Sequence, residues 1–266
     1  MREINILRKE IAICFTREST YKNQLLGWII ADFIKIITLI FVWLAVARVN
    51  KVVSVEFVVT YYLFLMLVSK LTSDYTLESG VRDMISGKFS NSLLKPFNYL
   101  VEYLGFDLGN NFLRFLLFIP VFIIGIIVAQ HNGMWGYTFN FFILSLFIIS
   151  TILGFMISFL LGNIVSLVGL KIKEIDGIRI FYYNISAMLS GEFIPIFFLS
   201  SSWQTVFKVL PFRYTLSFPV EILIGDLDER LLMEGFVYSV SWMLVLLIIY
   251  KFAFNYFIKY YESEGM

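Results

Sequence analysis

Three ionisable side chains lie inside apolar stretches of the sequence, where chemistry would be least expected. Asp32 and Lys35 fall in the first apolar run, and Glu192 falls in a later one. An ionisable group in hydrocarbon is a functional hypothesis by default. The spacing of Asp32 and Lys35 puts both on one helical face, which predicts an intramembrane ion pair, with a substrate or partner contact as the alternative. Glu192 has no base nearby in the sequence, which favours a gate or an anchor between helices.

Motifs for catalysis or nucleotide binding are missing from the sequence. The triplet Ser86-Gly87-Lys88 fails as a phosphate loop, because Arg82 stands where glycine is needed and Phe89 where Ser or Thr is needed. HExxH and GxSxG do not occur. A single cysteine and a single histidine argue against a disulfide framework and a His/Cys metal cluster. We therefore expect no catalytic residue, metal or cofactor on this chain; if ATP drives it, another polypeptide binds the ATP.

Composition identifies the class of protein. The chain has 266 residues, of which 59% are hydrophobic and 15% charged, with a mean hydropathy of +0.81. A helix needs roughly 20 apolar residues to cross the hydrocarbon core, and no barrel-like alternation is present. We expect an all-α integral membrane protein with one domain over 1–266. The six predicted transmembrane spans are 25–47, 55–71, 112–129, 137–170, 180–199 and 236–257.

The N-terminal segment 1–23 predicts a helix lying at the membrane interface. Ile4, Leu7, Ile11 and Phe15 recur every three or four residues, which places them on one face. Charges throughout the segment argue against a cleavable signal peptide. A mobile basic lead-in is the alternative.

The segment 72–108 carries too many charges for lipid and is predicted to lie in the cytoplasm. Within it, Leu77, Val81, Met84 and Ile85 recur at helical spacing, which predicts a short amphipathic helix ending at Gly87. Its apolar face must be covered, either by the chain's own span ends or by the groove of a docked protein.

Two further stretches carry breakers or small residues. The segment 200–235 is too apolar for an ordinary loop and contains Pro211, Pro219 and Gly225, which suits short re-entrant helices. In the long run 137–170, the small residues predict close helix packing rather than a permeation path; they are Gly154, Gly162 and Gly169.

Lysine and arginine positions predict the orientation, because cytoplasmic loops hold the excess of basic residues. With both termini inside, the cytoplasmic segments collect fifteen lysines and arginines and the outer segments only five, with Lys35 left in the first span. The fifteen are Arg2, Arg8, Lys9, Arg17, Lys22, Lys70, Arg82, Lys88, Lys95, Arg114, Lys171, Lys173, Arg179, Lys251 and Lys259. The count favours cytoplasmic N- and C-termini and an even number of spans.

The sequence resembles the permeases of type-2 ABC exporters, in particular the bacterial six-span subgroup with paired permeases and a separate ATPase. The resemblance extends over nearly the whole chain and depends on a combination of short stretches. These are Ile85-Ser86-Gly87-Lys88-Phe89 through Leu93-Leu94-Lys95-Pro96, Leu189-Ser190-Gly191-Glu192-Phe193-Ile194-Pro195, Leu210-Pro211-Phe212-Arg213-Tyr214 and Phe218-Pro219-Val220-Glu221. The sequence departs from the family pattern at Ser200-Ser201-Ser202, where a proline is expected.

The resemblance implies the sites, partners and mechanism. An N-terminal elbow helix and a coupling helix that docks on the ATPase are expected, the latter with Leu77, Glu78, Val81, Arg82, Met84, Ile85 and Gly87. A gate or translocation path is expected at Glu192, Pro195, Pro211, Arg213, Pro219 and Glu221. Two ATPase copies holding ATP and Mg, a second and different permease, and the bacterial cytoplasmic membrane complete the assembly, with no nucleic acid. The implied function is alternating-access export of a hydrophobic or amphipathic substrate.

Two alternatives come from other classes of protein. One is an ATP-independent channel or secondary transporter that uses Asp32, Lys35 and Glu192 as a charge relay. The other is a membrane enzyme acting on lipid, although the Asp, Glu, Ser and Lys residues form no recognisable catalytic set.

Overall fold

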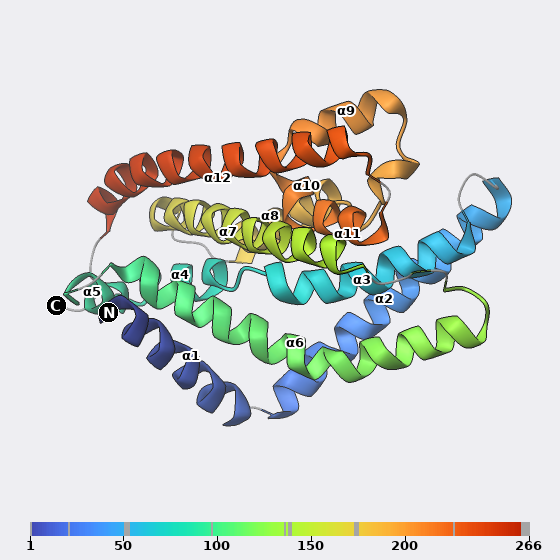
Figure 1. Cartoon of the computed structure of the whole chain (residues 1–266). Helices are drawn as coiled ribbons and strands as arrows, with labels where there is room; N and C mark the ends of the chain where they lie inside the picture. Colours follow the sequence, from blue (N-terminus) through green and yellow to red (C-terminus); the bar gives the residue numbers. More distant parts are fainter. Residues whose placement is uncertain are drawn as a thin grey trace.

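The computed structural model describes residues 2–20, 22–50, 54–96, 98–135, 137, 140–172, 176–225 and 227–261. Within these ranges the chain is helical and contains no strand (Figure 1). The elements are α1 Arg2–Thr20, α2 Lys22–Asn50, α3 Val55–Thr72, α4 Thr76–Ile85, α5 Phe89–Leu93, α6 Tyr99–His131, α7 Phe141–Ile172, α8 Asp176–Leu189, η1 Ile196–Phe198, α9 Ser201–Val209, α10 Pro211–Thr215, α11 Ser217–Ile224, α12 Glu229–Phe257 and η2 Ile258–Tyr260. The expected all-α membrane fold is confirmed.

Five helical stretches in the described ranges are long and apolar enough to cross a membrane. They comprise α2, α3 continued toward α4, α6, α7 and α12. With 33 residues, α6 is about 50 Å long, well beyond the roughly 30 Å of a hydrocarbon core. The span predicted over 112–129 is therefore the second part of a helix whose first part lies among α1, α4 and α5 (Figure 1).

The single span predicted over 180–199 is wrong. The helix there, α8, ends at Leu189, and its 14 residues give about 21 Å, too short for a crossing. The chain then turns at Gly191, whose φ of 85° is in the left-handed region that favours glycine. Hydropathy continues through this turn, so run length did not reveal it. The short helices α9, α10 and α11 follow, in the segment predicted to be re-entrant.

Helix α7 lies at the centre of the bundle, packed against α3, α4, α10, α11 and α12 (Figure 1). Its three small residues are contact points, as predicted. A side chain at Gly154 would meet the backbone carbonyl of Tyr214, and one at Gly169 would meet the Val81 side chain. At Gly162 a side chain would collide with the carboxylate of Asp74. Close approach of α7 to α10, α4 and the α3–α4 link therefore depends on these glycines.

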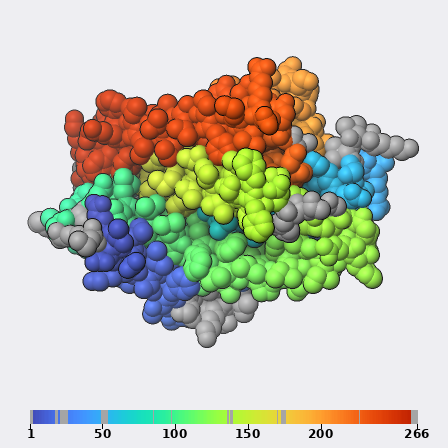
Figure 2. Space-filling model, viewed as in Figure 1, coloured from blue at the N-terminus to red at the C-terminus, as the bar shows by residue number. Residues whose placement is uncertain are grey.

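Helix α1 packs along the first part of α6, and Figure 2 shows it on the surface of the molecule. Two α6 glycines make the contact close. A Cβ at Gly105 would lie 2.7 Å from the Cβ of Glu10, and a Cβ at Gly109 would lie 2.8 Å from the Cβ of Cys14. Ile4 and Ile13 stay exposed on α1, so part of its apolar surface is uncovered within this chain. The segment predicted over 1–23 thus contains a helix, Arg2–Thr20, and its place at the membrane interface stays a prediction.

Replacing Gly154 by alanine should lower stability by about 1–3 kcal/mol, because the new Cβ would lie 2.6 Å from a backbone oxygen of α10 that cannot move aside cheaply. Thermal unfolding in detergent measures the effect. The matched control is Gly27→Ala on α2, where nothing lies within 4 Å and the change should be neutral or stabilising. Equal behaviour of the two variants would contradict the packing role of Gly154.

Candidate functional site: a charge network and the α4 surface

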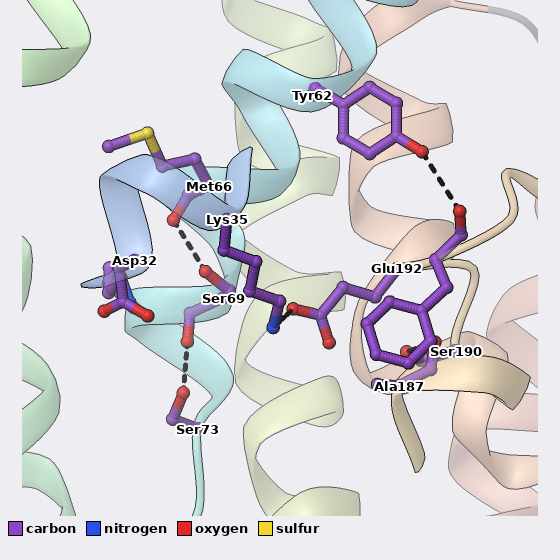
Figure 3. A network of polar contacts seen from close by, with 11 residues as sticks. Asp32, Lys35, Tyr62, Met66, Ser69, Ser73, Ala187, Ser190 and Glu192 are labelled. Carbon is purple, nitrogen blue, oxygen red and sulfur yellow. Dashed lines mark hydrogen bonds and ion pairs between the residues drawn. The ribbon is translucent and has the colours of Figure 1, made fainter. Parts of the chain in front are cut away.

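Two ion pairs join α2 to other segments inside the bundle. Asp32 pairs with Lys70 near the end of α3. Lys35 pairs with Glu192 in the turn after α8 (Figure 3). The ammonium group of Lys70 also lies 4.6 Å from the centre of the Phe118 ring, and its side chain is 8% exposed. We refer to Asp32, Lys35, Lys70 and Glu192 as the charge network.

The ion pair predicted between Asp32 and Lys35 does not form. Their helical spacing does put them near each other, but neighbouring segments offer each a partner of opposite charge. Glu192, which had no base in its sequence neighbourhood, receives one from α2. Ion pairs between segments neutralise both charges and also hold the segments together, which a pair within one helix cannot do.

The turn that carries Glu192 is held in place by aromatic side chains. Trp43 donates its indole N–H to the Phe193 carbonyl at 2.9 Å, and the Tyr61 hydroxyl donates to the Gly191 carbonyl at 2.9 Å. Tyr62 donates to the same Phe193 carbonyl at 3.4 Å (Figure 3). A side chain at Gly191 would also meet the Tyr61 hydroxyl at 3.0 Å. Helices α2 and α3 therefore fix the position of the Glu192 carboxylate.

The remaining residues expected on a gate or path lie around the short helices. Arg213 on α10 pairs with Glu221 on α11, and their side chains are 7% and 13% exposed. Pro211 opens α10 and Pro219 lies in the first turn of α11, where a missing backbone N–H costs little. Pro195 precedes the turn η1. The structure thus groups Arg213 with Glu221, and no ion pair among the described residues joins that pair to the charge network.

Helix α4 has its apolar face buried within the chain. Leu77, Val81 and Met84 are each less than 5% exposed, and Leu77 and Val81 pack with Tyr182 of α8. The sequence left open whether this face is covered by the chain itself or by a docked protein, and the structure shows that helices of the chain cover it. These three residues are therefore not free to form a docking surface. The side chain of Ile85 lies outside the described residues.

The opposite face of α4 is polar and accessible. Glu78 pairs with Arg82 at 2.7 Å and with Arg179 of α8 at 3.2 Å. After Ser86, Gly87 turns the chain with a φ of 74°, and α5 leads to Leu94, which is 83% exposed. The exposed residues of this region are Arg82, Ser86, Lys88, Asn91, Leu93 and Leu94, and we call them the α4–α5 tip.

The α4–α5 tip is tied to the end of the last long helix. The Tyr261 hydroxyl donates to the Gly87 carbonyl at 2.9 Å and accepts from the Ser90 N–H at 2.8 Å. Its ring also meets that of Phe89 edge to face, with 5.5 Å between centroids. Sequence spacing could not predict this contact, because 174 residues separate Gly87 from Tyr261.

The place of Lys70 in the charge network was not predicted from the sequence, where Lys70 counted among the cytoplasmic residues. The available signal was the position of Lys70 inside the predicted span 55–71, because a lysine in a membrane span needs a partner of opposite charge.

In chemical terms the network offers ion pairs that can break and re-form between segments. No cluster of three or more His, Cys, Asp or Glu in the described ranges could hold a metal ion.

Comparison with known proteins decides the family. The family model described as "ABC-2 family transporter protein" matches residues 25–265, most of the chain. The chain belongs to the ABC-2 transporter family. It is therefore a multi-pass membrane protein and a permease of an ABC transporter. No curated protein and no solved structure matches it.

Replacing Lys70 of the permease by methionine should destabilise it by about 3 kcal/mol, since Asp32 would keep its charge inside the bundle without a partner. Adding Asp32→Leu should recover most of that loss, because the pair is then removed together. A double-mutant cycle on unfolding in detergent measures the coupling. The control cycle uses Arg230 and Glu234, an exposed pair, where additive effects are expected. Additivity at Lys70 and Asp32 would contradict the pairing.

Proposed function

We propose that the permease exports a hydrophobic or amphipathic substrate by alternating access, driven by a separate ATPase. Two ATPase copies would hold ATP and Mg, and a second permease of different sequence would complete the transport path in the bacterial cytoplasmic membrane. The observation that supports this most is the two-sided character of α4. Its apolar face packs on the permease core, whereas its polar face is accessible and continues into the exposed α4–α5 tip.

Docking on the ATPase would use the α4–α5 tip rather than the apolar face of α4. Arg82, Ser86 and Lys88 offer hydrogen-bond donors and positive charge, and Leu94 offers an exposed apolar anchor. An interface with an apolar centre and a polar rim is the usual arrangement between proteins. Glu78 and Arg82 would contact the ATPase, as expected from the family resemblance. Leu77, Val81 and Met84 would instead join α4 to the permease core.

A push on the tip would reach the bundle through α7. Val81 of α4 lies against Gly169 of α7, and Gly154, further along α7, lies against the end of α10. Packed helices transmit displacement because they have little free volume. The motion of a docked ATPase would therefore be passed to α10 and α11 as well as to α7.

The charge network would act as a gate. Lys35 and Glu192 join α2 to the turn after α8, so any separation of these segments breaks their ion pair. The pair is bordered by aromatic rings, including Trp43 stacked on Phe198 at 4.4 Å between centroids. A substrate with an apolar body could pass along such rings while the ion pair opens. The free energy for opening would come from different affinities of the ATPase for the two states.

The proposed orientation places both termini and the α4–α5 tip in the cytoplasm. In a Cys14→Ser background, a membrane-impermeant maleimide applied to intact cells should label Asn132→Cys and leave Ser86→Cys unlabelled. Both positions are exposed in the protein, so access across the membrane decides the result. Labelling of Ser86→Cys after lysis serves as the control. The reverse pattern in intact cells would invert the proposed topology.

Reversing the charge at the tip should uncouple the permease from its ATPase. Arg82→Glu replaces a cation by an anion at the proposed interface and should reduce co-purification of a co-expressed candidate ATPase at least tenfold, by about 1.4 kcal/mol or more. The matched control is Arg230→Glu, because Arg230 is also exposed and also paired with a glutamate four residues away, but at the start of α12.

The same preparations test the ATP-driven mechanism. Vigorous ATP hydrolysis by the permease purified without its ATPase would contradict a separate energising subunit. Full co-purification of the ATPase with Arg82→Glu, or an equal loss with Arg230→Glu, would contradict docking at the α4–α5 tip. Unfolding temperatures of both variants should match the parent, because each change alters only an exposed ion pair.

A further inference from the structure

Two aspartates meet in the interior where α3 passes into α4. Asp74 lies in the link between these helices and Asp107 lies on α6, and they are 5% and 0% exposed. The two carboxyl groups are within hydrogen-bonding reach of each other. Neither belongs to the charge network or to the α4–α5 tip, and the proposed function does not use them.

Most oxygens of this pair have no hydrogen-bond donor. Asp74 accepts the Thr76 N–H at 3.1 Å through one oxygen. Its other oxygen and both oxygens of Asp107 are buried without a partner among the described residues. The Thr76 hydroxyl, on a residue that is 1% exposed, is also unpartnered and lies beside Asp107. The other donors beside the pair are the Thr76 hydroxyl and the backbone N–H groups of Tyr75 and Leu77. All of them are neutral, so none offsets the second negative charge, and none lies between the two carboxyl groups.

Among the described residues, no cation forms an ion pair with either carboxylate. The titratable and charged groups around the pair are Tyr75 from the link, Glu78 from α4, Arg114 from α6, and Tyr182 and Tyr183 from α8. The guanidinium of Arg114 lies over the Tyr75 ring, 4.6 Å from its centre, and is not among the groups that act on either carboxyl. The Tyr183 hydroxyl donates to the backbone carbonyl of Asp74 at 3.1 Å, not to its carboxylate.

The α7 side of the site offers no charge either. Gly162 faces Asp74 directly, and a side chain there would collide with the carboxylate. Asn163 and Ser166 direct their side-chain donors to carbonyls of α7 itself. The carboxylate of Asp74 is therefore pressed against the α7 backbone.

Two carboxylates this close in a site closed to water cannot both stay ionised. The missing positive charge must come from a metal cation or from a proton. A hard cation takes six or more oxygen ligands, or keeps several waters, and needs the room for them. Here one carboxylate already fills the space against Gly162. A proton needs no room, and it supplies the missing donor between the two groups.

We propose that Asp74 and Asp107 bind one proton between them, as a carboxyl group hydrogen-bonded to a carboxylate. The bound proton fastens the beginning of α4 to α6 and α7, because Asp74 also holds the Thr76 N–H in the first turn of α4. This inference is independent of the proposed function. It adds a proton-binding site at the root of the helix that carries the α4–α5 tip.

The sign of the pH effect follows from proton linkage. The folded permease keeps a proton that both aspartates lose in the unfolded chain above the acidic range. Stability is therefore highest at low pH and falls as pH rises through the point where the folded pair releases its proton. While the folded state holds one proton more than the unfolded state, the unfolding equilibrium constant rises about tenfold per pH unit.

Infrared difference spectroscopy and unfolding in detergent test the proposal on the full-length permease. The wild type at neutral pH should show the carbonyl stretch of a protonated carboxylic acid. Asp107→Asn should lose that band, because its amide can donate to Asp74 without a bound proton. Between about pH 6 and about pH 9, the same variant should also lose the linked part of the pH dependence. The control Asp176→Asn, on an exposed residue paired with Arg179, should keep both signals.

If Asp107→Asn does not fold, Asp74→Asn provides the same comparison, and the wild-type spectrum is informative without either variant. Absence of the protonated band in the wild type, or its persistence in a folded variant, overturns the proposal. Stability that depends on Na⁺, K⁺ or Mg²⁺ concentration at constant pH and is insensitive to pH would also overturn it, in favour of a metal cation.

Discussion

Pairing of charges between segments is the constraint on which this permease depends. A charge inside an apolar bundle is costly unless a partner of opposite sign is near, and here the partner is supplied by another segment. Asp32 and Lys35 bind α2 to α3 and to the turn after α8, and Arg213 binds α10 to α11. These ion pairs thus hold α2 and the short helices in place, whereas α1, α6, α7 and α12 are joined by packing of apolar and small residues.

Hydrophobic run length predicted the long helices well, because the bilayer requires long uninterrupted apolar segments. It failed at Leu189, where the apolar run continues although the helix ends. The glycine in Ser190-Gly191 was the available sign of a turn. The structure shows why it matters, because Gly191 adopts a left-handed conformation there. The small residues of α7 were correctly read as packing positions, because no side chain could fit at Gly154 or Gly162.

The candidate site was less predictable, since its contacts join residues far apart in the chain. Spacing along a helix places Asp32 near Lys35 but cannot show that Lys70 and Glu192 approach from other segments. The helical spacing of apolar residues predicted the apolar face of α4 but gave no indication of which segment covers it. Asp74 and Asp107 both belong to a segment predicted to be polar and solvated, so nothing in the sequence suggested that they would be buried together.

The hydrogen bonds of Tyr261 have a mechanical meaning. They tie the segment that follows α12 to Gly87 and Ser90, so α12 supports this region in addition to α6, whose Tyr99 ring packs on Phe89 (Figure 1). A segment held by one contact can rotate under load, whereas a segment held from several sides shares the load between its contacts and resists twisting. Force applied at the tip would thus be shared among α6, α7 and α12, and the Tyr261 contact would carry the part that reaches α12.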